Sequence, residues 1–157
     1  MNKLNVYCPI NGTGYGITST NIALALDDLG VDVGLFIIGQ GVLLQDPDQK
    51  QIMLKMLNRG RHYDPKAPCL KIWHQHDLAP RVGTGPYYAL PFFEIDKLHD
   101  FETHGLNNTD GVLTASEWSK KVLEDNGVKR PIHVCPLGVD RNIFNDDNKI
   151  KISNEKY

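Results

Sequence analysis

The sequence predicts an α/β fold: an open, mostly parallel, Rossmann-like sheet with helices on both faces. Short apolar runs alternate with segments of helical periodicity along the 157 residues. Some of these runs are almost continuously apolar, as expected of parallel strands that are buried on both faces. A glycine-rich loop directly follows the first run. Ligands of such sheets bind beyond the carboxyl ends of the strands, so site residues are expected there.

The first predicted unit is a strand, a loop and a helix. The apolar run at residues 4–8 precedes residues 11–16, where three glycines allow backbone angles that other residues resist. Thr18 or Ser19 is expected to cap the helix, and Gly30 stands where a helix-ending glycine belongs. Residues 31–38 then predict a second, fully buried strand.

The middle of the chain predicts one helix and two strands. Asp46 and Pro47 open the helix, with proline at its first position, and Gly60 is expected to close it. Strands are predicted at residues 70–74 and 87–93. Pro91 indicates that the second of these is an edge or bulged strand, because proline cannot donate to a strand ladder.

The last third predicts strand, helix and strand again. A short amphipathic stretch at residues 97–106 leads to a strand at 111–114, a helix at 117–126 with Ser116 as its cap, and a strand at 132–135. Trp118 on that helix is expected in the core or in an interface. We predict one Rossmann-like domain at residues 1–144 and a polar linker or tail at residues 145–157.

Composition excludes several classes of protein. Hydrophobic residues make up 41% and charged residues 23%, which is typical of a globular domain rather than a disordered or fibrous chain. The 17 basic and 19 acidic residues are scattered, so no nucleic-acid partner is expected. No apolar stretch predicts a signal peptide or a transmembrane segment. Cys8, Cys69 and Cys135 lack metal-binding spacing and predict buried free thiols, so we expect a cytoplasmic protein.

The glycine loop does not match the cofactor motifs. The third position of a dinucleotide fingerprint falls on Ile17 or Ser19, and no carboxylate follows the second strand. A P-loop is absent from the sequence, and no cofactor is expected. The loop can still bring backbone N–H groups and a helix N-terminus to an anionic or hydroxyl-rich ligand. The alternative is a tight turn that only connects strand and helix.

Histidine and acidic residues follow two of the predicted strands. Alternation places His74 and His76 on one face, and zinc would need a third protein ligand that the spacing does not supply, so no metal is expected. One of these histidines can bind a ligand or transfer a proton, with Asp77 as its orienting partner; the alternative is a structural histidine. Glu94 can anchor a hydroxyl ligand or serve as a solvated turn acid.

Several segments together resemble the amino-terminal domain of GT-B glycosyltransferases of family four, also called group one. The run at residues 134–140, V-C-P-L-G-V-D, followed by Phe144, resembles the segment that closes that domain. Residues 114–118, T-A-S-E-W, with Gly127 and Val128 after the next helix, resemble an earlier block of the same family. The glycine loop and His76 fit the same pattern.

The resemblance implies a retaining transfer of a sugar from a nucleotide-diphosphate sugar to a hydroxyl of a glycan, lipid or protein acceptor, without an obligatory metal. It implies that His76 contacts the reacting sugar as the catalytic residue. It also implies that three glycines, Gly12, Gly14 and Gly16, line the cleft near the donor phosphates and the acceptor. We add His74, Asp77 and Glu94 as substrate-binding residues from their positions after strands.

The family has a second domain that binds the nucleotide sugar through a basic pair and an E-x7-E motif, and the resemblance of this chain covers only the amino-terminal domain. We therefore expect this chain to be the first half of a longer enzyme, inactive without a missing carboxyl-terminal domain. One alternative is half of a split two-chain enzyme. Another is a non-catalytic α/β module that binds a partner chain through the face that the second domain would cover.

Overall fold

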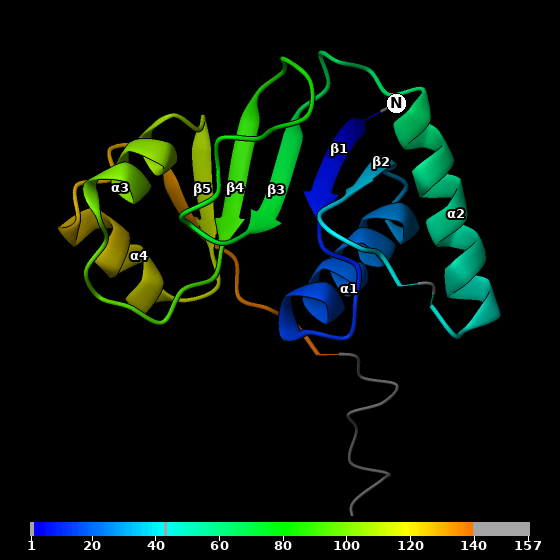
Figure 1. Cartoon of the computed structure of the whole chain (residues 1–157), viewed down its shortest axis with the longest axis horizontal. Coiled ribbons are helices and arrows are strands. Elements are labelled where there is room, and N and C mark those ends of the chain that lie inside the picture. The colour runs from blue at the N-terminus through cyan, green and yellow to red at the C-terminus, as the bar shows by residue number, and fades with distance from the viewer. Residues whose placement is uncertain (1, 43, 140–157) are drawn as a thin grey trace, which may run out of the picture.

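The computed structural model describes residues 2–42 and 44–139, which form one open six-stranded parallel sheet with four helices (Figure 1). The strands are β1 (Lys3–Cys8), β2 (Asp32–Ile37), β3 (Cys69–Trp73), β4 (Tyr87–Pro91), β5 (Gly111–Thr114) and β6 (Ile132–Val134). The helices are α1 (Gly14–Asp28), α2 (Pro47–Arg61), α3 (Asp100–Asn107) and α4 (Glu117–Asp125). The predicted α/β class is confirmed.

The strand order is β2-β1-β3-β4-β5-β6, and every pair is parallel. The chain moves from β1 outward to β2 and then returns past β1 to β3, so the direction of winding reverses between β1 and β3. Such a reversal opens a crevice at the carboxyl ends of β1 and β3, where ligands of open α/β sheets bind. Figure 1 shows α1 beginning at this end of the sheet.

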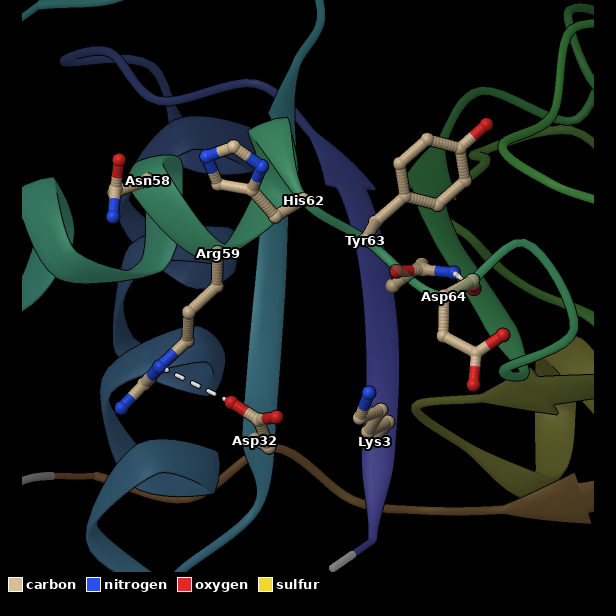
Figure 2. Close-up of a pocket in the computed structure, with 8 residues that line it drawn as sticks. Lys3, Asp32, Asn58, Arg59, His62, Tyr63 and Asp64 are labelled. Atoms are coloured by element: carbon tan, nitrogen blue, oxygen red, sulfur yellow. Dashed lines mark hydrogen bonds and ion pairs between the residues drawn. The ribbon is translucent and has the colours of Figure 1, made fainter.

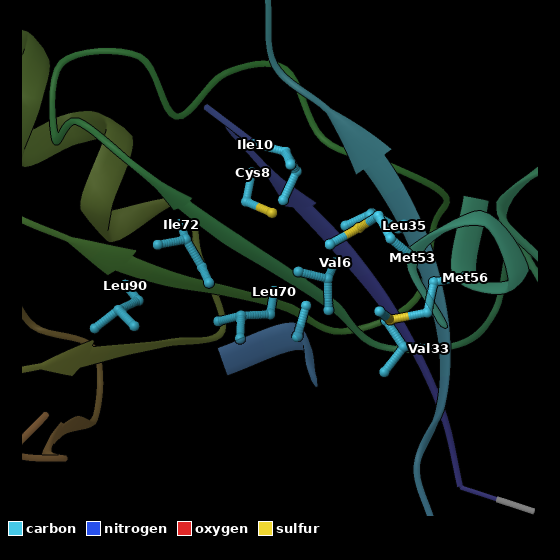
Figure 3. Packing of buried hydrophobic residues seen from close by; sticks show 11 residues of the cluster. Val6, Cys8, Ile10, Val33, Leu35, Met53, Met56, Leu70, Ile72 and Leu90 are labelled. Carbon is cyan, nitrogen blue, oxygen red and sulfur yellow. The ribbon is translucent and has the colours of Figure 1, made fainter. Parts of the chain in front are cut away.

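Two apolar clusters cover opposite faces of the sheet. Val6 and Leu70 are paired neighbours on one face, where they pack in one cluster with Ala23 of α1. Ala89 and Val112 point to the other face and pack with residues of α3 and α4. Figure 3 shows the first cluster around β1, β2 and β3. Its buried members are Val6, Cys8, Ile10, Ala23, Val33, Leu35, Met53, Met56, Leu70, Ile72 and Leu90.

The prediction that Gly60 ends the second helix is wrong, because α2 continues through it to Arg61. Gly60 is buried against β2, and a Cβ added there would lie 2.5 Å from the Leu35 carbonyl oxygen. Gly60 therefore allows close packing of α2 on β2. Asp46 caps this helix as expected, since its side chain accepts a hydrogen bond from the Gln49 N–H at 2.8 Å.

Two other local predictions are wrong. Helix α1 begins at Gly14 with Thr13 as its cap, rather than after Thr18 or Ser19, because the Thr13 side chain accepts from the Gly16 N–H. Strand β4 lies inside the sheet between β3 and β5, so it is not the edge strand that Pro91 indicated. Pro91 is the last residue of β4, where a missing N–H costs the ladder little.

Cys8 and Cys69 are buried free thiols, as predicted, but Cys135 is exposed because it follows β6 at the outer edge of the sheet. Ser116 caps α4 and Gly30 adopts a positive φ of 78° after α1, both as predicted. Within residues 2–42 and 44–139, no helix is long and apolar enough to cross a membrane. Asp140, Phe144 and the predicted tail at residues 145–157 lie outside the described residues.

Candidate functional site

A cavity of about 540 Å³ opens at the carboxyl ends of β3 and β4. Its wall combines residues from the start of α1, from the segments that follow β3 and β4, and from α4. These residues are Tyr15, His74, Gln75, His76, Phe92, Phe93, Glu94, Ile95 and Ser119. The cavity therefore lies at the carboxyl end of the sheet, and Tyr15 of α1 extends it toward the switch point between β1 and β3.

Strand register brings two of these segments together. Trp73 and Pro91 are paired partners and are also the last residues of β3 and β4. His74 and Phe92, the next residues, therefore leave the sheet beside each other. This shared exit explains how residues 18 positions apart in sequence come to line one cavity.

Tyr15 of α1 contacts both segments that leave the sheet after β3 and β4. Its hydroxyl donates a hydrogen bond to the Phe92 carbonyl oxygen at 2.6 Å and lies 2.9 Å from His74 Nδ1. Its ring contacts those of Trp73, His74 and Phe92, with centroid distances of 5.5, 4.5 and 5.5 Å. Burial, and secondarily the charge of Glu94, raise the pKa of Tyr15, which keeps the hydroxyl protonated.

The two histidines are stacked, with ring centroids 4.9 Å apart and an interplanar angle of 20°. Burial lowers the pKa of His74, and the neighbouring His76 lowers it further, while Asp77 opposes both effects. His74 is therefore neutral at neutral pH. A neutral imidazole can both donate and accept a hydrogen bond, which suits contact with a hydroxyl group.

The remaining wall is acidic and aromatic. Glu94 is exposed, and it is the one carboxylate among the residues that line this cavity. The Phe93 ring contacts that of Trp118 on α4, with centroids 6.0 Å apart. Carboxylate oxygens and a neutral imidazole beside aromatic rings favour a hydroxyl-rich ligand over a phosphate, because the carboxylate repels an anion.

The cavity brings together three of the predicted site residues, His74, His76 and Glu94. Asp77 does not line it. The Asp77 carboxylate instead lies 3.8 Å from the buried Lys71 Nζ, and the hydrogen-bond partner of His74 Nδ1 is the Tyr15 hydroxyl. The orienting partner of His74 is therefore Tyr15 rather than Asp77.

The three glycines occupy separate places. Gly12 lines a different cavity of about 250 Å³ between the start of α1 and three later residues, Val42, Leu44 and Gln45. Gly14 begins α1, and Gly16 is buried in its first turn, where an added Cβ would overlap Asn11. Gly16 is thus required for packing, whereas a Cβ on Gly12 or Gly14 would meet nothing within 4 Å.

Sequence reasoning missed Tyr15, Gln75, Phe92 and Ser119. For Tyr15 the available signal was an aromatic residue between two glycines, Gly14 and Gly16. Nothing in the sequence distinguished Gln75, Phe92 or Ser119 from ordinary polar and apolar residues. Their roles depend on which strands are neighbours.

Another cavity, of about 220 Å³, lies at the opposite edge of the sheet, near the amino ends of β1 and β2. Figure 2 shows Arg59 of α2 directed at Asp32 there. Arg59 pairs with Asp32 at 3.1 Å and with Asp27 at 2.5 Å, so its charge is already balanced. This cavity is therefore a weaker candidate than the one at the carboxyl ends.

No group of three or more His, Cys, Asp or Glu side chains in the part of the chain that the structure describes is arranged to hold a metal ion. No protein-family model matches the chain, and no curated protein is similar to it in sequence.

Proposed function

We propose that this chain is the acceptor-side, amino-terminal domain of a GT-B glycosyltransferase of family four. Such an enzyme transfers a sugar from a nucleotide-diphosphate sugar to an acceptor hydroxyl with retention of configuration. The observation that carries the proposal is the cavity beyond β3 and β4, where His74, His76 and Glu94 lie beside aromatic rings. A second, donor-binding domain is part of the proposal.

The chemistry of the cavity supports a hydroxyl acceptor. Glu94 and a neutral His74 can accept hydrogen bonds from sugar hydroxyls, and the rings of Tyr15 and Phe92 offer apolar contact to a sugar face. In this proposal His76 contacts the transferred sugar. The negative charge of Glu94 directs the donor phosphates away from this cavity, toward the start of α1 and the second domain.

The test is a transfer assay on the complete gene product with a panel of nucleotide sugars and hydroxyl acceptors, comparing wild type with His76→Ala. Loss of a group that contacts the reacting centre should lower turnover about 100-fold or more. His133→Ala is the matched control, because His133 is an exposed histidine on β6 outside the cavity. Circular dichroism and urea unfolding check that both variants fold.

Two results would contradict this proposal. Unchanged turnover in His76→Ala would remove His76 from the site. Absence of transfer and of donor hydrolysis with every nucleotide sugar would reject the glycosyltransferase itself.

A second candidate function is a non-catalytic module that binds a partner chain, either a protein partner or the other half of a split enzyme. The observation that favours it is the exposure of large apolar side chains near the cavity: Trp118 is 51% exposed and Ile95 is 40% exposed. Sedimentation velocity over a range of concentrations tests it. Self-association that Trp118→Arg abolishes would favour this function, and a monomer that binds hydroxyl-rich ligands would count against it.

A further inference from the structure

We infer that Tyr15 is a positioning residue that fixes the tautomer of His74, so that Nε2 carries no proton and accepts a hydrogen bond from a ligand hydroxyl. The identity of that ligand rests on the proposed function. The tautomer itself follows from the contacts of Tyr15 and from the neutral state of the His74 ring.

The number of protons on each group decides the direction of the two hydrogen bonds. A tyrosine hydroxyl has one proton to donate and can also accept, whereas a carbonyl oxygen can only accept. The Tyr15 hydroxyl lies 2.6 Å from the Phe92 carbonyl oxygen, so its proton is directed there. His74 Nδ1 lies 2.9 Å from the same hydroxyl oxygen and must therefore be the donor in that contact. A neutral imidazole carries one N–H, so Nε2 is left as an acceptor.

Packing holds the hydroxyl in this arrangement. The Tyr15 ring is surrounded by Trp73, His74 and Phe92. These neighbours come from the ends of two paired strands, so rotation of the Tyr15 ring would lose three aromatic contacts. The lowered pKa of His74 keeps the ring neutral, which the tautomer argument requires.

The tautomer decides what the cavity can bind. An unprotonated Nε2 accepts from a hydroxyl but offers no proton to a phosphate or carboxylate oxygen. Glu94 in the same cavity is also an acceptor. In the opposite tautomer, Nε2 of His74 would be a hydrogen-bond donor instead of an acceptor. Tyr15 therefore contributes to selection of a hydroxyl donor over an anion, although its own hydroxyl is engaged by Phe92 and His74.

Long-range ¹H–¹⁵N NMR correlation on ¹⁵N-labelled protein at mildly alkaline pH tests this inference, since it distinguishes protonated from unprotonated ring nitrogens. The His74 signals are assigned by their loss in His74→Asn. We expect a protonated Nδ1 and an unprotonated Nε2 in wild type. Tyr15→Phe should move the proton of His74 toward Nε2. Tyr63→Phe is the control, because Tyr63 lies at the opposite edge of the sheet.

A protonated Nε2 in wild type, or an unchanged pattern in Tyr15→Phe, would overturn the inference. The wild-type spectrum decides the tautomer even where Tyr15→Phe fails to fold. The NMR result is independent of the transfer assay. If the protein is inactive but has the expected tautomer, the proposed function is rejected and the positioning role of Tyr15 is retained. If the protein is active but has the opposite tautomer, the proposed function is retained and the positioning role is rejected.

Discussion

Gly60→Ala should destabilise the protein even though alanine favours helices more than glycine does. Gly60 lies inside α2, where the exchange would by itself add about 0.8–1 kcal/mol of helix propensity. The new Cβ, however, would lie 2.5 Å from the Leu35 carbonyl oxygen, and ordinary van der Waals contact begins at 3.4 Å. Helix and strand would therefore have to separate by about 0.9 Å locally.

The size of the effect follows from weighing these two contributions. Separation of α2 from β2 would loosen the packing of Met53 and Met56, which are buried in the main cluster. Overpacking of this kind costs about 1–3 kcal/mol, and the close approach to backbone places Gly60 at the upper end of that range. After the helix-propensity gain, we expect a net loss of about 1–2 kcal/mol, or a fall in Tm of roughly 2–8 °C.

Urea unfolding followed by circular dichroism and tryptophan fluorescence measures this loss. Gly105→Ala is the matched control, because Gly105 also lies within a helix but its added Cβ would meet only the Leu78 Cβ, at 3.8 Å. That exchange should raise stability by up to about 1 kcal/mol. A Gly60→Ala variant as stable as wild type would refute the claim that Gly60 is retained for close packing.

Three further predictions concern buried and capping groups. The Lys71 side chain is fully buried and its pKa is lowered from 10.5, chiefly by desolvation. At pH values between the lowered pKa and 10.5, the unfolded chain binds a proton at Lys71 that the folded chain releases, so the free energy of unfolding should rise with pH. Urea titrations at several pH values measure this rise, which should be absent in Lys71→Met. A thiol reagent should modify the exposed Cys135 quickly and the buried Cys8 and Cys69 slowly. Burial also raises the pKa of Cys8 to about 12, which lowers its thiolate fraction. Cys135→Ser should remove the fast phase of modification. Asp46→Ala should cost about 1 kcal/mol in urea unfolding through loss of the α2 cap.

Most of the fold could be predicted because its signals are local. Apolar runs, cap residues and the glycine after α1 act within a few residues of chain, and they predicted all six strands and the order of the elements. Gly60 and Pro91 were misread for a different reason. Each has a local tendency to end or weaken an element, but its structural setting depends on a partner from another part of the chain, β2 for Gly60 and β3 for Pro91.

The candidate site was predictable in part for the same reason. His74, His76 and Glu94 come directly after strands, so the topological rule for α/β sheets located them without knowledge of strand neighbours. Asp77 satisfied the same rule and yet lies beside Lys71, because the segment after β3 turns away from the cavity within a few residues. Position after a strand indicates a region of the sheet, and the direction of the following turn determines which side chains enter the cavity.

The part of the site that sequence could not predict is its hydrogen-bond direction. Alternation placed His74 and His76 on one face, but either tautomer of either ring fits that pattern. The direction is decided by the Phe92 carbonyl, which lies beside His74 only because β3 and β4 end at paired residues. The acceptor at Phe92 is a backbone carbonyl, which is present with any side chain at that position. Substitution at Phe92 should therefore leave the tautomer of His74 unchanged, whereas Tyr15→Phe should alter it. Strand register, together with the side chains of Tyr15 and His74, therefore specifies the chemistry that this end of the sheet presents to a ligand.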